Sequence, residues 1–79
     1  MTEKITLLSP LEGGVTEIEL REPTVDEIAK VTDDEKKFGA VRAMKNLISV
    51  MAGIDVSLVG KMGARDFNAC NKYLSAFFE

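Results

Sequence analysis

The chain has 79 residues and a net charge of −3, with 46% hydrophobic and 29% charged residues, a composition typical of one small globular domain. A single cysteine, Cys70, and the lack of histidine exclude an internal disulfide, a Cys/His zinc site and a nucleophile–histidine catalytic pair. No apolar run approaches the roughly 20 residues of a membrane helix, and the first residues lack a signal-peptide pattern, so we expect a cytosolic protein.

Charge is distributed unevenly along the chain. Residues 1–37 hold ten acids and five bases, for a net −5, whereas residues 38–79 hold three acids and five bases, for a net +2. No dense basic stripe is present of the kind that displaces counterions from nucleic acid. Nucleic acid is therefore not an expected partner.

The first elements read as a β-hairpin over about residues 4–21. The segment VTEIELR alternates apolar and charged residues, which is the pattern of a half-buried strand. Ile5 and Leu7 share one side of the preceding extended segment, and Pro10, Gly13 and Gly14 between the two segments suit a hairpin loop.

Helical patterns follow Pro23. Thr24 and Glu27 form a capping box that starts a helix over about 25–31. Thr32 and Glu35 repeat the same spacing, so we expect a second helix over about 33–52 that ends before Gly53.

The predicted helix 33–52 has an unusually wide apolar face. At about 100° per residue, its apolar side chains cover an arc of roughly 200–240°, where an ordinary surface helix needs only about 100° or somewhat more. The residues of this arc are Phe38, Ala40, Val41, Ala43, Met44, Leu47, Ile48, Val50, Met51 and Ala52. We expect the helix to be covered on more than one side, by the rest of the domain or by a partner.

The remaining residues predict a short helical turn at about 57–62 and a last helix over about 64–78. Phe67, Cys70, Leu74 and Phe77 form one apolar stripe on that last helix. The predicted fold is a small single α+β domain, residues 1–79, in which an N-terminal β-hairpin is followed by three or four α-helices.

The sequence offers candidate binding residues and no catalytic ones. The glycines form neither of the phosphate-binding patterns G-x-x-x-x-G-K-[ST] and G-x-G-x-x-G. Cys70 lies on the apolar face of the last predicted helix, which is typical of a buried, unreactive thiol. We expect no enzyme activity, no metal and no cofactor. Met44 and Met51 lie seven residues apart, on one face of the predicted helix 33–52. They fit core packing or, alternatively, an adaptable contact surface. The candidate partner-binding residues are Met44, Leu47, Met51, Tyr73 and Phe78.

The order of these segments resembles the small tail assembly chaperones of contractile-tailed, Mu-like bacteriophages. The resemblance spans nearly the whole chain and is carried by KITLLSP, by TEIELREPTVDEI with its Arg21-Glu22-Pro23-Thr24-Val25 segment, by the long helix ending at Gly53-Ile54, and by DFNACNKYLSAFF. The family has no fixed catalytic or ligand-binding residues to transfer.

The resemblance implies a chaperone that binds the tape measure protein and keeps it soluble until tail tube subunits polymerise. It also implies a location in the host bacterial cytoplasm and absence from the mature virion. Family members are often made in a short form and a longer, frameshifted form, and Ala76-Phe77-Phe78 is compatible with a slippery run of uridines. Further partners are therefore the tail tube protein and a longer form of the chain itself.

Other interpretations stay open from the sequence. The chain is, alternatively, a structural tail subunit retained in the virion, or a small helical regulator that contacts nucleic acid. The apolar surplus also predicts homo-oligomers at high concentration, because a two-stranded hairpin is marginal unless its face is covered.

Overall fold

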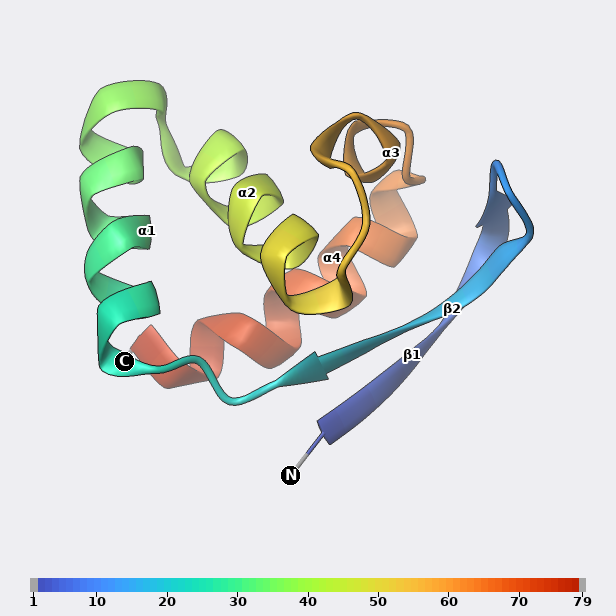
Figure 1. Ribbon diagram of the computed structural model, residues 1–79, viewed down its shortest axis with the longest axis horizontal. Coiled ribbons are helices and arrows are strands. Elements are labelled where there is room, and N and C mark those ends of the chain that lie inside the picture. Colours follow the sequence, from blue (N-terminus) through green and yellow to red (C-terminus); the bar gives the residue numbers. More distant parts are fainter. Residues whose placement is uncertain (1, 79) are drawn as a thin grey trace.

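The computed structural model describes residues 2–78; residues 1 and 79, which begin and end the predicted domain, lie outside the described residues. An antiparallel hairpin is followed by four helices and a short 3-10 turn, which confirms the predicted α+β fold (Figure 1). The elements in order are β1 Thr2–Leu11, β2 Val15–Arg21, α1 Val25–Phe38, α2 Ala40–Ala52, α3 Val56–Gly60, α4 Ala64–Ser75 and η1 Ala76–Phe78. The radius of gyration, 11.8 Å, is close to the roughly 12 Å of a compact chain of this length.

The hairpin pairs in a simple register that breaks once. Thr2 lies opposite Arg21 and Thr6 opposite Glu17, but the next pair is Leu11 with Val15. Residues 7–10 of β1 therefore face only Thr16 of β2, which forms a bulge. Such a bulge bends its strand and frees backbone N–H groups that need other partners.

Asp66 supplies those partners. Its Oδ1 accepts a hydrogen bond from the Leu8 backbone N–H at 2.8 Å, and its Oδ2 accepts one from Ser9 at 3.1 Å. The carboxylate is 3% exposed and lies in the first turn of α4, where the helix dipole favours a negative charge. This contact joins the bulge of β1 to the start of α4.

One face of the hairpin is buried as the alternation predicted. Ile18 and Leu20 of β2 point inward, while Thr16, Glu17 and Glu19 are exposed. In Figure 1 the helices gather on one side of the twisted hairpin, and β2 contacts α2 while β1 contacts α4.

The passage from β2 into α1 is fixed by a network around Glu27. The predicted capping box is present: the Glu27 N–H donates to Thr24 Oγ1 at 3.2 Å, and the Thr24 N–H donates to Glu27 Oε1 at 2.9 Å. Arg21 at the end of β2 donates to both Glu27 oxygens, at 2.8 and 2.7 Å. These bonds hold the pKa of Glu27 at about 2, below its ordinary 4.5, mainly through the Arg21 hydrogen bond.

The break between the first two helices lies at Gly39, which corrects the predicted division into helices 25–31 and 33–52. Thr32 forms no second capping box, because its hydroxyl donates to the Ile28 carbonyl at 3.0 Å within a continuous helix. Lys30 and Asp34, one turn apart, form an ion pair across the predicted break. Gly39 ends α1 at a φ of +93°, a backbone conformation that favours glycine.

The boundaries of the elements after Gly39 lie closer to the predicted ones. Gly53 ends α2 in the left-handed conformation, as predicted. The predicted turn at 57–62 is the short helix α3, Val56–Gly60, and the predicted helix 64–78 is α4 with the 3-10 turn η1 at its end.

The core lies between the hairpin and the helices. Every element from β1 to α4 contributes to it, and its two methionines are Met44 in α2 and Met62 between α3 and α4. The buried apolar residues are Leu7, Leu11, Ile18, Leu20, Val31, Ala43, Met44, Leu47, Ile48, Val59, Met62, Cys70 and Leu74.

Replacing Asp66 should destabilise the protein. Asp66→Ala leaves the Leu8 and Ser9 N–H groups without acceptors, so the free energy of unfolding should fall by about 1–3 kcal/mol. Urea unfolding followed by circular dichroism measures this change. Asp33→Asn removes an exposed carboxylate from α1 and should change stability by no more than about 0.5 kcal/mol. Equal effects of the two substitutions would contradict the role given to Asp66.

The Glu27 network should make stability depend on acidity. Because the folded-state pKa of Glu27 lies below its ordinary value, its contribution is full above about pH 4.5 and is lost as the pH falls toward about 2. Glu27→Gln should flatten this part of the stability–pH profile, measured by urea unfolding at successive pH values. The double variant Arg21→Gln/Glu27→Gln should have the profile of Glu27→Gln alone. A wild-type slope retained in Glu27→Gln would refute the assignment.

Candidate protein-binding surface

One side of helix α2 is buried, and the residues at the two edges of that side are exposed. Its buried residues are Ala43, Met44, Leu47 and Ile48. Val41 and Val50 flank this buried stripe on opposite sides, since nine residues correspond to about half a turn, and they are 70% and 65% exposed. The wide apolar arc predicted for this helix is therefore only partly covered by the described residues of the chain.

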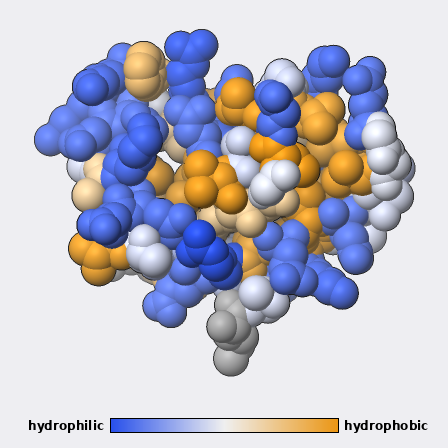
Figure 2. Space-filling view, in the orientation of Figure 1, coloured by the Kyte–Doolittle hydropathy of each residue, from blue (hydrophilic) through white to orange (hydrophobic). Residues whose placement is uncertain are grey.

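Apolar surface occurs elsewhere in smaller pieces. Phe38, at the end of α1, is 52% exposed and lies beneath the Arg42 guanidinium, 5.5 Å from the ring centroid. Leu8 in the β1 bulge and Val25 at the start of α1 are also exposed. Figure 2 shows the apolar side chains of one face as several patches separated by hydrophilic ones. Contiguous apolar patches are more informative about binding than such single side chains.

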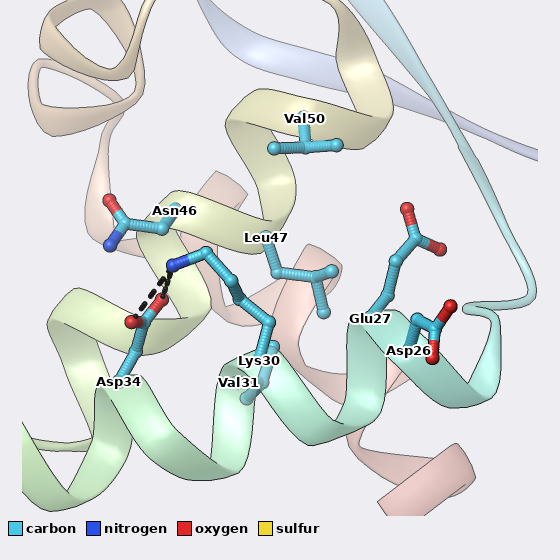
Figure 3. Close-up of a pocket in the computed structure, with 8 residues that line it drawn as sticks. All are labelled: Asp26, Glu27, Lys30, Val31, Asp34, Asn46, Leu47 and Val50. Atoms are coloured by element: carbon cyan, nitrogen blue, oxygen red, sulfur yellow. Dashed lines mark hydrogen bonds and ion pairs between the residues drawn. The ribbon is translucent and has the colours of Figure 1, made fainter.

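A groove runs between α1 and α2 and has an apolar floor. Its volume is about 220 Å³, and Val31 of α1 faces Leu47 and Val50 of α2 across it (Figure 3). Val31 and Leu47 belong to the core, so the groove opens directly onto buried packing. Val50 forms the exposed wall.

The rim of the groove is charged and comes mostly from α1. Asp26 and Glu27 lie near one end, and Asp34 with Lys30 lies near the other (Figure 3). Lys30 Nζ donates to both Asp34 oxygens, at 3.1 and 3.2 Å. Asn46 is the polar residue that α2 adds to the lining. Three carboxylates against one ammonium make this rim acidic.

A second hollow, of about 470 Å³, lies where the C-terminal turn meets α1 and α2. Ile28, Met44, Phe77 and Phe78 contribute apolar surface to it. Phe77 also packs edge-on against Tyr73, with ring centroids 5.4 Å apart and planes at 76°. This geometry is one of the preferred arrangements of aromatic pairs.

The structure separates the five candidate residues into core and edge. Met44 and Leu47 are 8% and 4% exposed and lie in the core, whereas Met51, Tyr73 and Phe78 are half-buried against it. Met44 and Phe78 meet at the second hollow, and Leu47 reaches the floor of the α1–α2 groove. Met51 and Tyr73 are not among the side chains that line either hollow. The role of all five residues in binding stays a prediction.

The sequence-based candidates missed the more accessible residues. Val50 and Val41 were counted in the apolar arc, but the candidates were chosen from its centre, which is where a helix packs against its own core. Asp26, on the rim, gave no signal beyond an ordinary acid in a first helical turn.

The single cysteine, Cys70, is a buried, free thiol. Burial raises the pKa of the Cys70 thiol to about 11, and the nearby Asp66 carboxylate acts in the same direction, so the thiol stays uncharged near neutral pH. Within residues 2–78, no three histidine, cysteine, aspartate or glutamate side chains are grouped to hold a metal ion. None of the helices in that part of the chain has the length and hydropathy to cross a membrane.

Comparison with known proteins gives a family for this chain. The model of a family described as phage tail assembly chaperone proteins, E, or 41 or 14, matches residues 4–79. This span includes nearly all of the hairpin and every helix described above. Comparisons with curated proteins and with solved structures gave no match.

Proposed function

We propose that this chain, which belongs to the family of phage tail assembly chaperones, binds the tape measure protein and keeps it soluble until the tail tube polymerises around it. Membership of the family indicates a non-enzymatic role with protein partners in tail assembly. The tape measure protein as client, and solubilisation as the mechanism, are the proposal.

The uncovered edges of α2 are the observation that supports this proposal most directly. Val41 and Val50 leave apolar surface on both sides of the buried stripe, and the α1–α2 groove adds an apolar hollow beside one of them. A long helical client that exposes apolar stripes before assembly would find matching surface here, in the way amphipathic helices dock in grooves.

The proposal extends to place and time. The chain acts in the host bacterial cytoplasm, is displaced when tail tube subunits arrive, and is absent from the mature virion. Self-association at high concentration would cover the Val41 edge while no client is present.

A longer, frameshifted form of the chain belongs to the same proposal. Phe77 and Phe78 line the second hollow together with Ile28 and Val31 of α1, so residues added after them would begin at an apolar surface. The gene sequence tests this directly: UUC codons for both phenylalanines, or the lack of an overlapping downstream frame, would exclude slippage there.

Co-expression tests the central claim. The tape measure protein encoded in the same tail gene cluster should become more soluble when co-expressed with this chain, and the two should co-purify. The matched control is the same client co-expressed with an unrelated acidic protein of similar size. Unchanged aggregation together with the lack of co-purification would refute the proposal.

A second measurement separates a chaperone from a structural subunit. Mass spectrometry of purified virions should detect the tail tube protein but not this chain. Stoichiometric recovery of the chain from virions would favour the retained tail subunit instead.

A further inference from the structure

The groove between α1 and α2 combines a small apolar hollow with a mainly acidic rim. Its volume of about 220 Å³ is below the roughly 300–1,000 Å³ of pockets that hold small molecules. Such a hollow suits one or two apolar side chains. The exposed Val50 wall and the Val31 and Leu47 floor would surround such a side chain on three sides (Figure 3).

The rim determines which residues can lie beside that side chain. Glu27 is already neutralised by Arg21, and Asp34 by Lys30. Asp26 is exposed and forms no ion pair among residues 2–78. A carboxylate at the mouth of an apolar hollow attracts a cation and repels an anion, with most effect where the contact excludes water.

We propose that this groove binds an amphipathic helical segment of the client that inserts an apolar side chain between α1 and α2 and places a lysine or arginine against Asp26. The proposal rests on the proposed function and adds to it the chemistry of the bound segment. A docked helix of this kind would lie along α1 and α2, which are 14 and 13 residues long and thus about 20 Å each.

A second copy of the chain fits this groove less well. A two-fold dimer places the same patch of each copy opposite itself, so that the unpaired Asp26 carboxylates of the two copies would approach each other. Each copy also carries a net charge of −3. Like charges brought together in this way oppose association.

The test uses defined probe peptides and the full chain. The first probe is a fluorescein-labelled amphipathic helix of leucine and lysine, about 18 residues long because shorter isolated helices are marginal. The second probe has the same length and leucine positions, with glutamate in place of lysine. Fluorescence anisotropy should show that the chain binds the leucine–lysine peptide and not the leucine–glutamate peptide, and that salt weakens this binding.

Variants at the groove make the test specific. Val50→Asp should weaken binding of the leucine–lysine peptide by about tenfold or more, since it puts a charge on the apolar wall. Val56→Asp is the matched control, because Val56 is also an exposed valine but lies on α3, outside the groove lining, and its replacement should leave binding unchanged. Asp26→Lys should lower affinity for the leucine–lysine peptide and raise it for the leucine–glutamate peptide, whereas Asp33→Lys, which is outside the groove lining, should do neither. Circular dichroism melting of each variant confirms that it is folded.

The outcomes separate this inference from the proposed function. If the wild-type chain solubilises the tape measure protein but Val50→Asp does so equally well, or both probes bind alike, the groove is not the site and the chaperone role stands. If the groove variants change sedimentation of the chain and leave peptide binding intact, the groove is an interface between copies and the inference is refuted. If the leucine–lysine peptide binds as predicted but the tape measure protein is neither bound nor solubilised, the groove is supported and the client must be a different tail protein.

Discussion

The buried carboxylate of Asp66 connects the two halves of this fold. It accepts two backbone N–H groups from the β1 bulge, and it does so from the first turn of α4, 57 and 58 residues away along the chain. The bulge brings both Leu7 and Leu11 into the core, although they are four residues apart and only one β2 residue lies opposite the four between the paired positions. Charge-assisted bonds of this kind are stronger than neutral ones. A two-stranded hairpin is marginal by itself, so its attachment to α4 decides whether the helices have a sheet to pack against.

Local patterns predicted the elements better than the contacts between them. The alternation in β2 and the capping box at Thr24 depend on neighbouring residues, and both are present in the structure. The repeat of that spacing at Thr32 was misleading, because the hydroxyl bonds the carbonyl one turn back when the helix continues. The long-range bonds of Asp66 could not be predicted, since nothing in the local pattern distinguishes a solvent-facing aspartate in the first turn of a helix from one that binds a distant strand.

The exposed apolar surface of α2 was predicted in extent but not in position. The width of the α2 apolar arc correctly indicated more apolar surface than one packed face needs. Which part of the arc stays open depends on where α1, α3 and the hairpin lie, and this is a tertiary property. Met44 and Leu47 lie at the centre of the arc and are covered by the chain itself, while Val41 and Val50 lie at its edges and are not. For an amphipathic helix with an excess arc, the edges are therefore the better candidates for contact with a partner.

Small size explains why such edges remain open. A domain of this length buries only about 60% of the surface of its unfolded chain, so covering both valines would require a larger core. The two edges then differ in charge. Val50 shares the groove lining with three carboxylates of α1, whereas the residue that follows Val41 is Arg42, whose guanidinium lies over the Phe38 ring. A groove that binds a client must remain open when two copies of the chain meet. The unpaired carboxylate of Asp26 on the groove rim serves both requirements, because it repels the same patch of a second copy and selects a partner of opposite charge.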